Sequence, residues 1–258
     1  MKSRNWRWIS ASVRGTSHVK AGTECQDRHL CTEFASQDGP VLLLIVSDGA
    51  GSAKRSAEGA QLACETLRDE IVRYFDERGK VSEINSRLVA HWIEVFRSEV
   101  ILLAEGEGLS EKEFACTLIG AVVGLHSAAF FQVGDGAAVF SRNAGGPYTL
   151  AFWPDRGEYE NTTYFATQST FIEQLQFLLV EATIREIGLM SDGLQRLALN
   201  YQTQQPHSPF FCGLFPAVRS TCDADFPIMN EKLTTYLDSP KVNERTDDDK
   251  TLILAVAR

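Results

Sequence analysis

The stretch Val41-Leu-Leu-Leu-Ile-Val-Ser-Asp48-Gly49 joins a continuous apolar run directly to an acid and a glycine. A short apolar run that ends in a turn signal is typical of a buried β-strand. Asp48 would then lie at the rim of the core, held rigidly where the strand ends. This pattern decides the fold because it recurs along the chain.

Three further segments pair an apolar run with acids. Residues 128–134 lead into Asp135-Gly136, residues 187–191 lead into Asp192-Gly193, and Asp247-Asp248-Asp249-Lys250 precedes the run 251–257. Acids that converge at one rim repel each other, and hard divalent cations with oxygen ligands are the simplest groups to offset them. A single Asp-Gly pair is more often a turn, as we interpret Asp38-Gly39. The recurrence after strands therefore favours a metal site.

Composition restricts the possible functions. The chain has 258 residues, of which 44% are hydrophobic and 23% charged, which is typical of a globular protein with an ample core. The net charge of −9 argues against a nucleic-acid-binding surface. No apolar stretch approaches the roughly 18 residues that span a bilayer. The cysteines show no zinc-binding spacing, and no apolar signal core follows the first residues. We expect a cytoplasmic protein without nucleic-acid or membrane partners.

The hydrophobic periodicity predicts an alternation of strands and helices. Strands are expected over residues 6–13, 28–34, 41–47, 114–125, 127–133, 137–141, 148–153, 171–184 and 186–191, and helices over 53–78, 82–105, 193–200 and 226–237. Residues 154–170 are predicted to form a surface loop, and residues 201–225 carry little periodicity. Neither a linker nor an internal repeat is visible. These features predict one layered α+β domain over residues 1–258.

The order of the motifs is more specific than any one of them. Along the chain they are Gln26-Asp27, Ser47-Asp48-Gly49-Ala50-Gly51 before a helix, Cys116-Thr117, Gly134-Asp135-Gly136, Met190-Ser191-Asp192-Gly193 and Asp248-Asp249-Lys250-Thr251. Over residues 8–257 this set resembles the type-2C, metal-dependent protein serine/threonine phosphatases (the PPM family), particularly their compact bacterial branch. Asn161-Thr162-Thr163 and the Cys-Gln-Asp segment also resemble that branch. The resemblance implies a four-layer α-β-β-α sandwich of two antiparallel β-sheets flanked by α-helices, with the metal site at one end.

The resemblance also implies roles for individual residues. Asp48 would bridge two Mg²⁺ or Mn²⁺ ions, and the Gly49 carbonyl would complete one coordination shell. Asp192 and Asp248 would bind the other ion. Asp135 matches an acid that helps to hold an additional, weaker metal, and Asp27 matches the second acid of a Glu-Asp pair. Two such ions clamp both oxygens of an in-line displacement and activate a water, so no side-chain nucleophile is required. The sequence contains no Ser-His-Asp or Cys-x5-Arg arrangement.

Three positions depart from the family pattern. Gln26 stands where the family has Glu, Ala50 replaces a histidine proposed as general acid, and Gly22 aligns with the phosphate-binding arginine. We expect compensation from Arg14, His18 or Lys20 in phosphate binding. Our hypothesis is that His18 contacts the phosphate or protonates the leaving oxygen; the alternative is a structural or exposed histidine. Asp247 and Asp249 either support the site or are solvated.

The resulting functional prediction is metal-dependent hydrolysis of phosphoserine and phosphothreonine in proteins, opposing a bacterial kinase, by a monomer. One alternative is a pseudophosphatase that acts as a binding or regulatory module, which the three departures favour. The retained Asp48, Asp192 and Asp248 argue against it, because a dead site has no reason to keep mutually repelling acids. A small-molecule phosphoesterase is the other alternative. Residues 154–170 and 201–225 are expected to carry the substrate-recognising surface.

Overall fold

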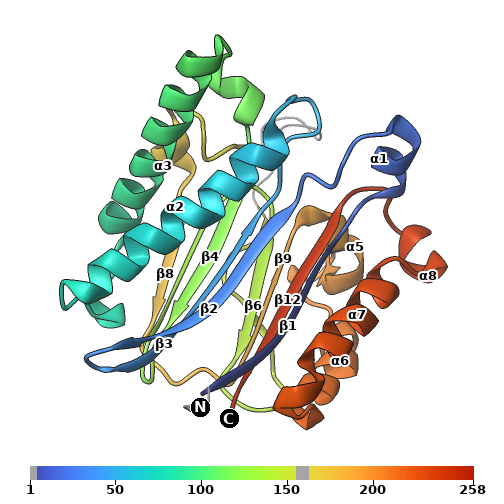
Figure 1. Cartoon of the computed structure of the whole chain (residues 1–258). Coiled ribbons are helices and arrows are strands. Elements are labelled where there is room, and N and C mark those ends of the chain that lie inside the picture. The colour runs from blue at the N-terminus through green and yellow to red at the C-terminus, as the bar shows by residue number, and fades with distance from the viewer. Residues whose placement is uncertain (1–4, 155–162) are drawn as a thin grey trace.

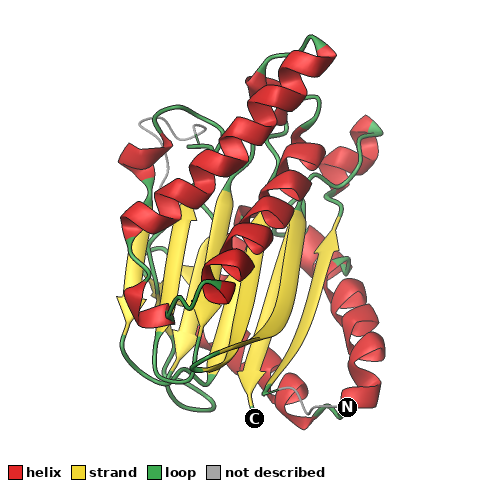
Figure 2. Cartoon of the chain, turned by 60° about the vertical axis from the view of Figure 1, so that its left-hand side comes forward, coloured by secondary structure: helices red, strands yellow, loops and turns green. Residues whose placement is uncertain are grey.

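The computed structural model describes residues 5–154 and 163–258. Two five-stranded antiparallel sheets lie face to face at its centre, and long helices cover both outer faces (Figures 1 and 2). This arrangement confirms the predicted four-layer α-β-β-α sandwich. No helix in these residues is long and apolar enough to cross a membrane.

The strand order shows how the chain is threaded through the two sheets. One sheet has the order β1 (Trp6–Val13), β12 (Lys250–Ala257), β9 (Glu186–Met190), β6 (Ala137–Ser141) and β7 (Thr149–Leu150). The other has the order β2 (Arg28–Ser36), β3 (Gly39–Ser47), β4 (Leu118–Val123), β5 (Ala128–Val133) and β8 (Gln176–Val180). A small additional sheet pairs β10 (Leu199–Asn200) with β11 (Gln205–Pro206).

Two helix pairs form the outer layers. The long helices α2 (Ser56–Asp76) and α3 (Ser86–Glu107) cover the β2-to-β8 sheet, and α6 (Ser208–Ser220) and α7 (Phe226–Leu237) cover the other. Short helices are α1 (Thr16–Ala21), α4 (Phe171–Gln174), α5 (Gln195–Ala198) and α8 (Pro240–Asn243). Single 3₁₀ turns lie at Val81–Glu83, Glu111–Phe114, Asp192–Leu194 and Asp223–Asp225.

The long apolar runs follow from burial on both faces of a strand. In β3, Val41, Leu43 and Ile45 pack against α2 and α3, whereas Leu42, Leu44 and Val46 pack between the sheets. Successive side chains of a strand point to opposite faces, so a strand in the interior of a four-layer protein needs apolar residues at every position. Strand β12 repeats the pattern on the other sheet.

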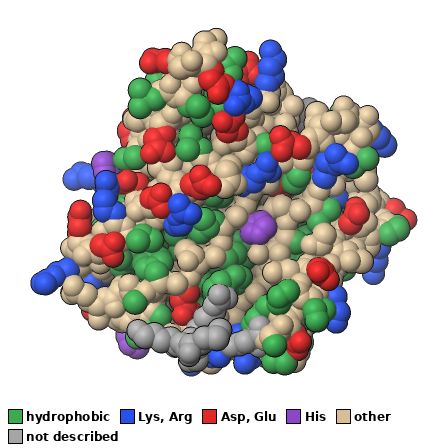
Figure 3. All heavy atoms as spheres, viewed as in Figure 1, with side chains coloured by type: hydrophobic (Ala, Val, Ile, Leu, Met, Phe, Trp, Pro, Cys, Tyr) green, Lys and Arg blue, Asp and Glu red, His purple; other side chains and the backbone are tan. Residues whose placement is uncertain are grey.

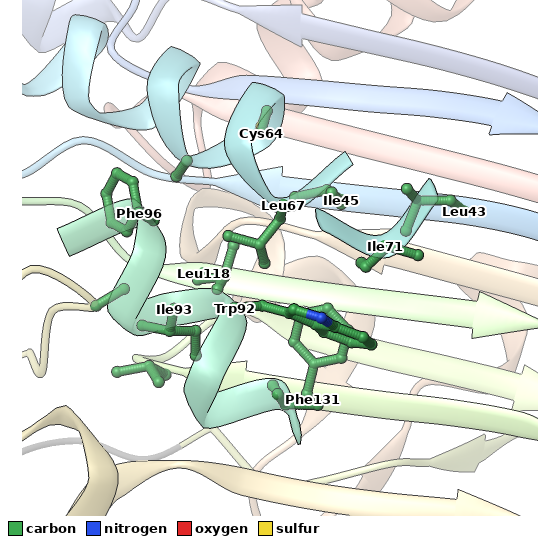
Figure 4. Packing of buried hydrophobic residues seen from close by; sticks show 14 of the residues in the cluster. Leu43, Ile45, Cys64, Leu67, Ile71, Trp92, Ile93, Phe96, Leu118 and Phe131 are labelled. Atoms are coloured by element: carbon green, nitrogen blue, oxygen red, sulfur yellow. The ribbon is translucent and has the colours of Figure 1, made fainter. Parts of the chain in front are cut away.

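The helix-facing core is densely filled by large side chains. Leu67 and Ile71 of α2 and Trp92, Ile93 and Phe96 of α3 point toward the strands, where they meet Leu43, Ile45, Leu118 and Phe131 (Figure 4). All are almost fully buried, and burying one such side chain stabilises the fold by about 1.5–3 kcal/mol. On the outside, acidic and basic side chains are interspersed over the face shown in Figure 3.

Strand register brings the acidic segments to one edge. Strand β12 lies between β1 and β9, with Trp6 opposite Ala257, so the start of β1 lies beside the end of β12 (Figure 1). Leu252 near the start of β12 pairs with Met190 at the end of β9. Asp248, which precedes β12, and Asp192, which follows β9, therefore meet at the same edge.

Several sequence predictions need correction. The predicted strand 114–125 is confined to β4, and the predicted helix 193–200 ends at Ala198, because Leu199 and Asn200 pair with β11 as β10. Helix α6 lies inside residues 201–225, where we expected irregular structure; Gly213 and Pro216 interrupt its helical pattern, and burial of Phe211 and Phe215 stabilises it instead. The predicted strand 171–184 begins with α4 and pairs only as β8. The predicted strand 148–153 shortens to β7. In the predicted loop 154–170, residues 163–170 contain no strand, and residues 155–162, including Asn161 and Thr162, lie outside the described residues.

Candidate active site

A pocket of about 760 Å³ opens where β3 ends. It collects most of the predicted site residues from five parts of the chain: Asp48 and Gly49, Asp135, Asp192, Asp248, and His18. The other lining residues are Ser17, Ala50, Gly51, Ser52, Thr117, Thr163, Tyr164, Phe165, Gln168 and Thr170. Asp27 is buried next to these acids without lining the pocket.

Asp48 is held by the segment that precedes β4. Its backbone N–H donates to Thr117 Oγ1 at 3.1 Å, and its carbonyl accepts from the Thr117 N–H at 2.8 Å. Gly49 forms an isolated bridge with Cys116. A Cβ on Gly49 would stand 2.7 Å from the backbone of Ser56, where α2 begins, so only glycine fits there. The Cys116-Thr117 motif thus holds the backbone of Asp48 and Gly49 in position.

Ser191 connects Asp27 to the edge where β9 and β12 meet. Its hydroxyl donates to Asp27 Oδ2 at 2.7 Å and accepts from the Thr251 N–H at 3.0 Å. Asp192 follows directly and begins a 3₁₀ turn. A Cβ on Gly193 would stand 2.0 Å from the Asp249 carbonyl oxygen, so this turn lies directly against the acidic segment.

Asp249 ties the segment before β12 to the N-terminal part of the chain. Its carboxylate is 2% exposed and accepts from the Gly15 N–H at 2.6 Å and the Gln26 N–H at 2.5 Å. His18 Nδ1 lies 3.0 Å from Asp249 Oδ2. Of the two roles left open for Asp249, the structure therefore shows the supporting one, whereas the Asp247 side chain is exposed.

Asp135 enters the pocket from the turn after β5. Gly134 has a φ of +110°, which lets the chain turn sharply before the acid. Gln195 donates to the Asp135 carbonyl, and Thr163 Oγ1 donates to Asp135 Oδ2 at 3.1 Å. Asp135 is thereby attached both to α5 and to the loop that follows β7.

The acids are close enough to disturb one another's ionisation. Burial, followed by repulsion from Asp27, Asp192 and Asp248, raises the pKa of Asp48 well above its usual range. Burial, then repulsion by Asp135 and Asp248, raises the pKa of Asp192 to about 8. Burial likewise raises the pKa of Asp27 to about 6, although hydrogen bonds from Ser191 and Thr251 oppose the rise. The site therefore stores unfavourable negative charge.

The donor set fits hard divalent cations. All candidate ligands are oxygens, and the buried Asp27 Oδ1 and Asp192 Oδ1 have no hydrogen-bond partner within the described residues. Over residues 5–154 and 163–258, however, no three acidic, His or Cys side chains converge on one point as a finished metal cage. Asp48 and Asp192 are instead close enough to perturb each other's ionisation.

Only one of the three predicted phosphate-binding residues reaches the pocket. His18 lines it, whereas Arg14 donates to the Thr23 carbonyl at 3.2 Å and Lys20 is exposed on α1. His18 Nε2 lies 3.9 Å from where a Cβ on Gly51 would stand, beside Ala50. Gly22, at the family's arginine position, ends α1 in the left-handed region with a φ of +72°.

Fold and site together indicate a class of protein. The order of the sequence motifs implied a metal-dependent phosphate-ester hydrolase, and such an enzyme is expected to have a four-layer sandwich with carboxylates gathered at one end. A family model described as protein phosphatase 2C matches residues 14–238. The chain therefore belongs to the protein phosphatase 2C family of metal-dependent enzymes, which confirms the resemblance seen in the sequence.

Particular relatives support this assignment. The chain is 34% identical to serine/threonine-protein phosphatase 3 of Escherichia coli over 255 residues, with 98% of each chain covered. Serine/threonine phosphatase Stp1 from Staphylococcus aureus superposes with a TM-score of 0.58 at 15% identity, over 100% of this chain and 96% of that one. The catalytic domain of the phosphatase PstP, solved in complex with 2 manganese ions, has a TM-score of 0.59 at 16% identity and 97% coverage of both chains. At such identities the solved structures establish the fold.

Proposed function

We propose that the chain hydrolyses phosphoserine and phosphothreonine in proteins, opposing a serine/threonine kinase, at the pocket lined by Asp48, Asp192 and Asp248. The observation that carries the proposal is the pocket itself, because it gathers these acids with raised pKa values in a chain of the protein phosphatase 2C family. The relative with 34% identity is a serine/threonine-protein phosphatase, and the match covers 98% of both chains.

Asp48 with the Gly49 carbonyl, and Asp192 with Asp248, would hold two Mn²⁺ or Mg²⁺ ions, and Asp135 would help to hold a third, weaker one. Asp27, which is buried beside Asp48 and does not line the pocket, would support the metal site from the protein interior. The chemistry that such ions supply is charge offset, polarisation of phosphoryl oxygens and a water of lowered pKa. Ser191 and Thr117 hold the acids in place by the hydrogen bonds described above.

His18 is placed to act on the leaving group. Its Nδ1 lies 3.0 Å from Asp249 Oδ2, and its Nε2 lies on the side of Gly51 in the pocket. As the phosphorus–oxygen bond to the substrate side chain breaks, a proton on Nε2 would pass to the leaving oxygen. The same N–H would contact a phosphate oxygen before the reaction. Ala50 stands at the position of the family's histidine, and His18 is the only histidine among the described residues that line the pocket.

The test is hydrolysis of para-nitrophenyl phosphate and of a phosphothreonine peptide with Mn²⁺, Mg²⁺ or EDTA. We expect metal-dependent turnover that Asp48→Asn abolishes, together with weaker Mn²⁺ binding by calorimetry and an intact or more stable fold. Asp38→Asn is the matched control, because Asp38-Gly39 is an exposed turn between β2 and β3.

Three results would contradict the proposal. Full activity in Asp48→Asn would refute the proposed metal centre. Metal-dependent thermal stabilisation without turnover on either substrate would indicate a pseudophosphatase. Turnover of small esters and nucleotides, but not of phosphopeptides, would indicate a small-molecule phosphoesterase.

A further inference from the structure

A second, smaller pocket of about 180 Å³ lies on the other side of Asp192 and Asp248. These two acids line both pockets, so the smaller one continues directly from the candidate active site. Its other walls come from α5 and the turn after it, and from the segment between α8 and β12. The remaining lining residues are Gly193, Gln195, Arg196, Tyr201, Arg245, Thr246 and Asp247.

Two arginines line this second pocket without forming an ion pair with a carboxylate of the described residues. Arg196 and Arg245 are exposed, and neither forms an ion pair with the residues that the structure describes. Other arginines of the chain do form such pairs, namely Arg28, Arg55, Arg68, Arg73, Arg97 and Arg219. Arginines outside this pocket, such as Arg14 and Arg142, also form no ion pair with the described residues. What distinguishes Arg196 and Arg245 is their place in a pocket that adjoins the candidate active site.

The wall between the arginines is preformed. The Tyr201 hydroxyl donates to Gln195 Oε1, and the Tyr201 ring packs edge-on against Trp153 with centroids 5.4 Å apart. Three acids also line the pocket. Asp192 and Asp248 belong to the proposed metal centre, whose cations would offset their charge, and the Asp247 side chain is exposed. The guanidinium groups of Arg196 and Arg245 are therefore available to bind an anionic group of a ligand.

The main pocket lacks this chemistry. Among the described residues that line it there is neither a lysine nor an arginine. Guanidinium groups bind carboxylates and phosphates through paired, charge-assisted hydrogen bonds. Among the described residues, the positive side chains that share a pocket with these acids are therefore Arg196 and Arg245.

We propose that the Arg196–Arg245 pocket is a specificity site that binds an anionic side chain of the substrate, a carboxylate or a second phosphate, close to the phosphoresidue being hydrolysed. This inference rests on the proposed phosphatase function and names its preferred substrate class. An extended peptide rises about 3.3 Å per residue, so acids within about three residues of the phosphoresidue lie within about 10 Å of it. Phosphopeptides with neighbouring acids are the preferred substrates.

The experiment compares kcat/KM for a family of phosphothreonine peptides. In one set a single glutamate is moved through about three positions on each side of the phosphothreonine; further peptides carry alanine, lysine or a second phosphothreonine at the best position. Arg196→Gln and Arg245→Gln, singly and together, remove the charge and keep a polar side chain. Arg142→Gln is the charge-matched control, because Arg142 is exposed after the far end of β6. Melting curves establish that each variant is folded.

We expect one glutamate position to raise kcat/KM by about threefold to tenfold over alanine, the size of an exposed charge-assisted contact. The ratio of acidic to neutral peptide should fall toward one in the double variant, remain in Arg142→Gln, and shrink as salt is raised. A larger effect of phosphate than of glutamate identifies a second phosphate as the preferred anion, and equal effects identify any carboxylate or phosphate.

Three outcomes overturn the inference. Wild-type enzyme that hydrolyses all peptides equally refutes it while leaving the proposed function standing, as does a preference for acids that the double variant retains. Absence of turnover on every phosphopeptide, with Mn²⁺ present, refutes the proposed function itself and the inference with it.

Discussion

His18 and Asp249 form a histidine–carboxylate pair at the edge of the active-site pocket, with Nδ1 of one 3.0 Å from Oδ2 of the other. Asp249 is fixed in turn by the backbone N–H groups of Gly15 and Gln26, which lie 234 and 223 residues away in the chain. This 3.0 Å contact has an ion-pair distance without the geometry of a hydrogen bond, and it lies on the opposite side of the ring from Nε2. Substitution of either residue therefore tests the role of His18.

The first prediction concerns the leaving group. His18→Ala should lower kcat on a phosphothreonine peptide by about 10²-fold, because the alkoxide needs a proton as it departs. The loss on para-nitrophenyl phosphate should be much smaller, since nitrophenolate leaves as a stable anion. Asp249→Asn should act in the same direction and more weakly, whereas Asp76→Asn, an exposed acid at the end of α2, should match the wild type. Equal losses on both substrates, or unchanged turnover across pH, would exclude the general-acid role.

The second prediction concerns pH and stability without metal. The folded-state pKa of Asp27 is raised from 3.8 to about 6 and that of Asp192 to about 8, so the folded chain binds more protons than the unfolded chain between these values. Stability must then fall as pH rises from about 4 to about 8, by about 1.4 kcal/mol per pH unit for each extra proton bound. Urea unfolding in EDTA measures this slope, which Asp192→Asn should reduce and Mn²⁺ should counteract. A rise in stability over the same window would contradict the buried repulsion.

The third prediction concerns the contact between the Asp192 turn and the acidic segment. In Gly193→Ala the new Cβ would meet the Asp249 carbonyl oxygen at 2.0 Å, so the two segments must separate. We expect a loss of about 1–3 kcal/mol of stability and lower turnover, because Asp192 and Asp248 move apart. Gly213→Ala is the control: nothing lies within 4 Å of its Cβ position in α6, so the helix should gain up to about 1 kcal/mol. Wild-type activity in Gly193→Ala would contradict the tight fit.

The fourth prediction tests the helix-facing core. Leu67 of α2 is fully buried against the β2-to-β8 sheet (Figure 4). Leu67→Ala should cost about 2–5 kcal/mol in urea unfolding, from lost burial and the cavity left behind. Leu102→Ala, on the same helix pair but 69% exposed, should stay within about 0.5 kcal/mol of the wild type. Equal effects of the two substitutions would mean that α2 and α3 do not depend on this cluster.

The acids and the strands that carry them could be predicted because both signals are local. Residues 41–49 show burial on both faces and a turn within a few positions, and the ordered repetition of that pattern indicated the family. Helix α6 could not be found in this way, since Pro216 and Gly213 conceal a segment that tertiary packing stabilises. The contact between Asp249 and His18 could not be predicted from the sequence either, because the two residues are far apart in the chain. The shared pocket of Arg196 and Arg245 was likewise not predictable, because the fold brings α5 and the segment before β12 together from distant parts of the sequence.

The position of β12 between β1 and β9 affects how the chain folds during its synthesis. Strand β12 is translated more than 200 residues after its sheet neighbour β1, so one edge of β1 lacks its partner until β12 has been made. The Asp248-Asp249 segment is translated just before that strand. The growing chain therefore cannot complete the proposed active site before β12 is inserted, and we expect activity only once the sheet is complete.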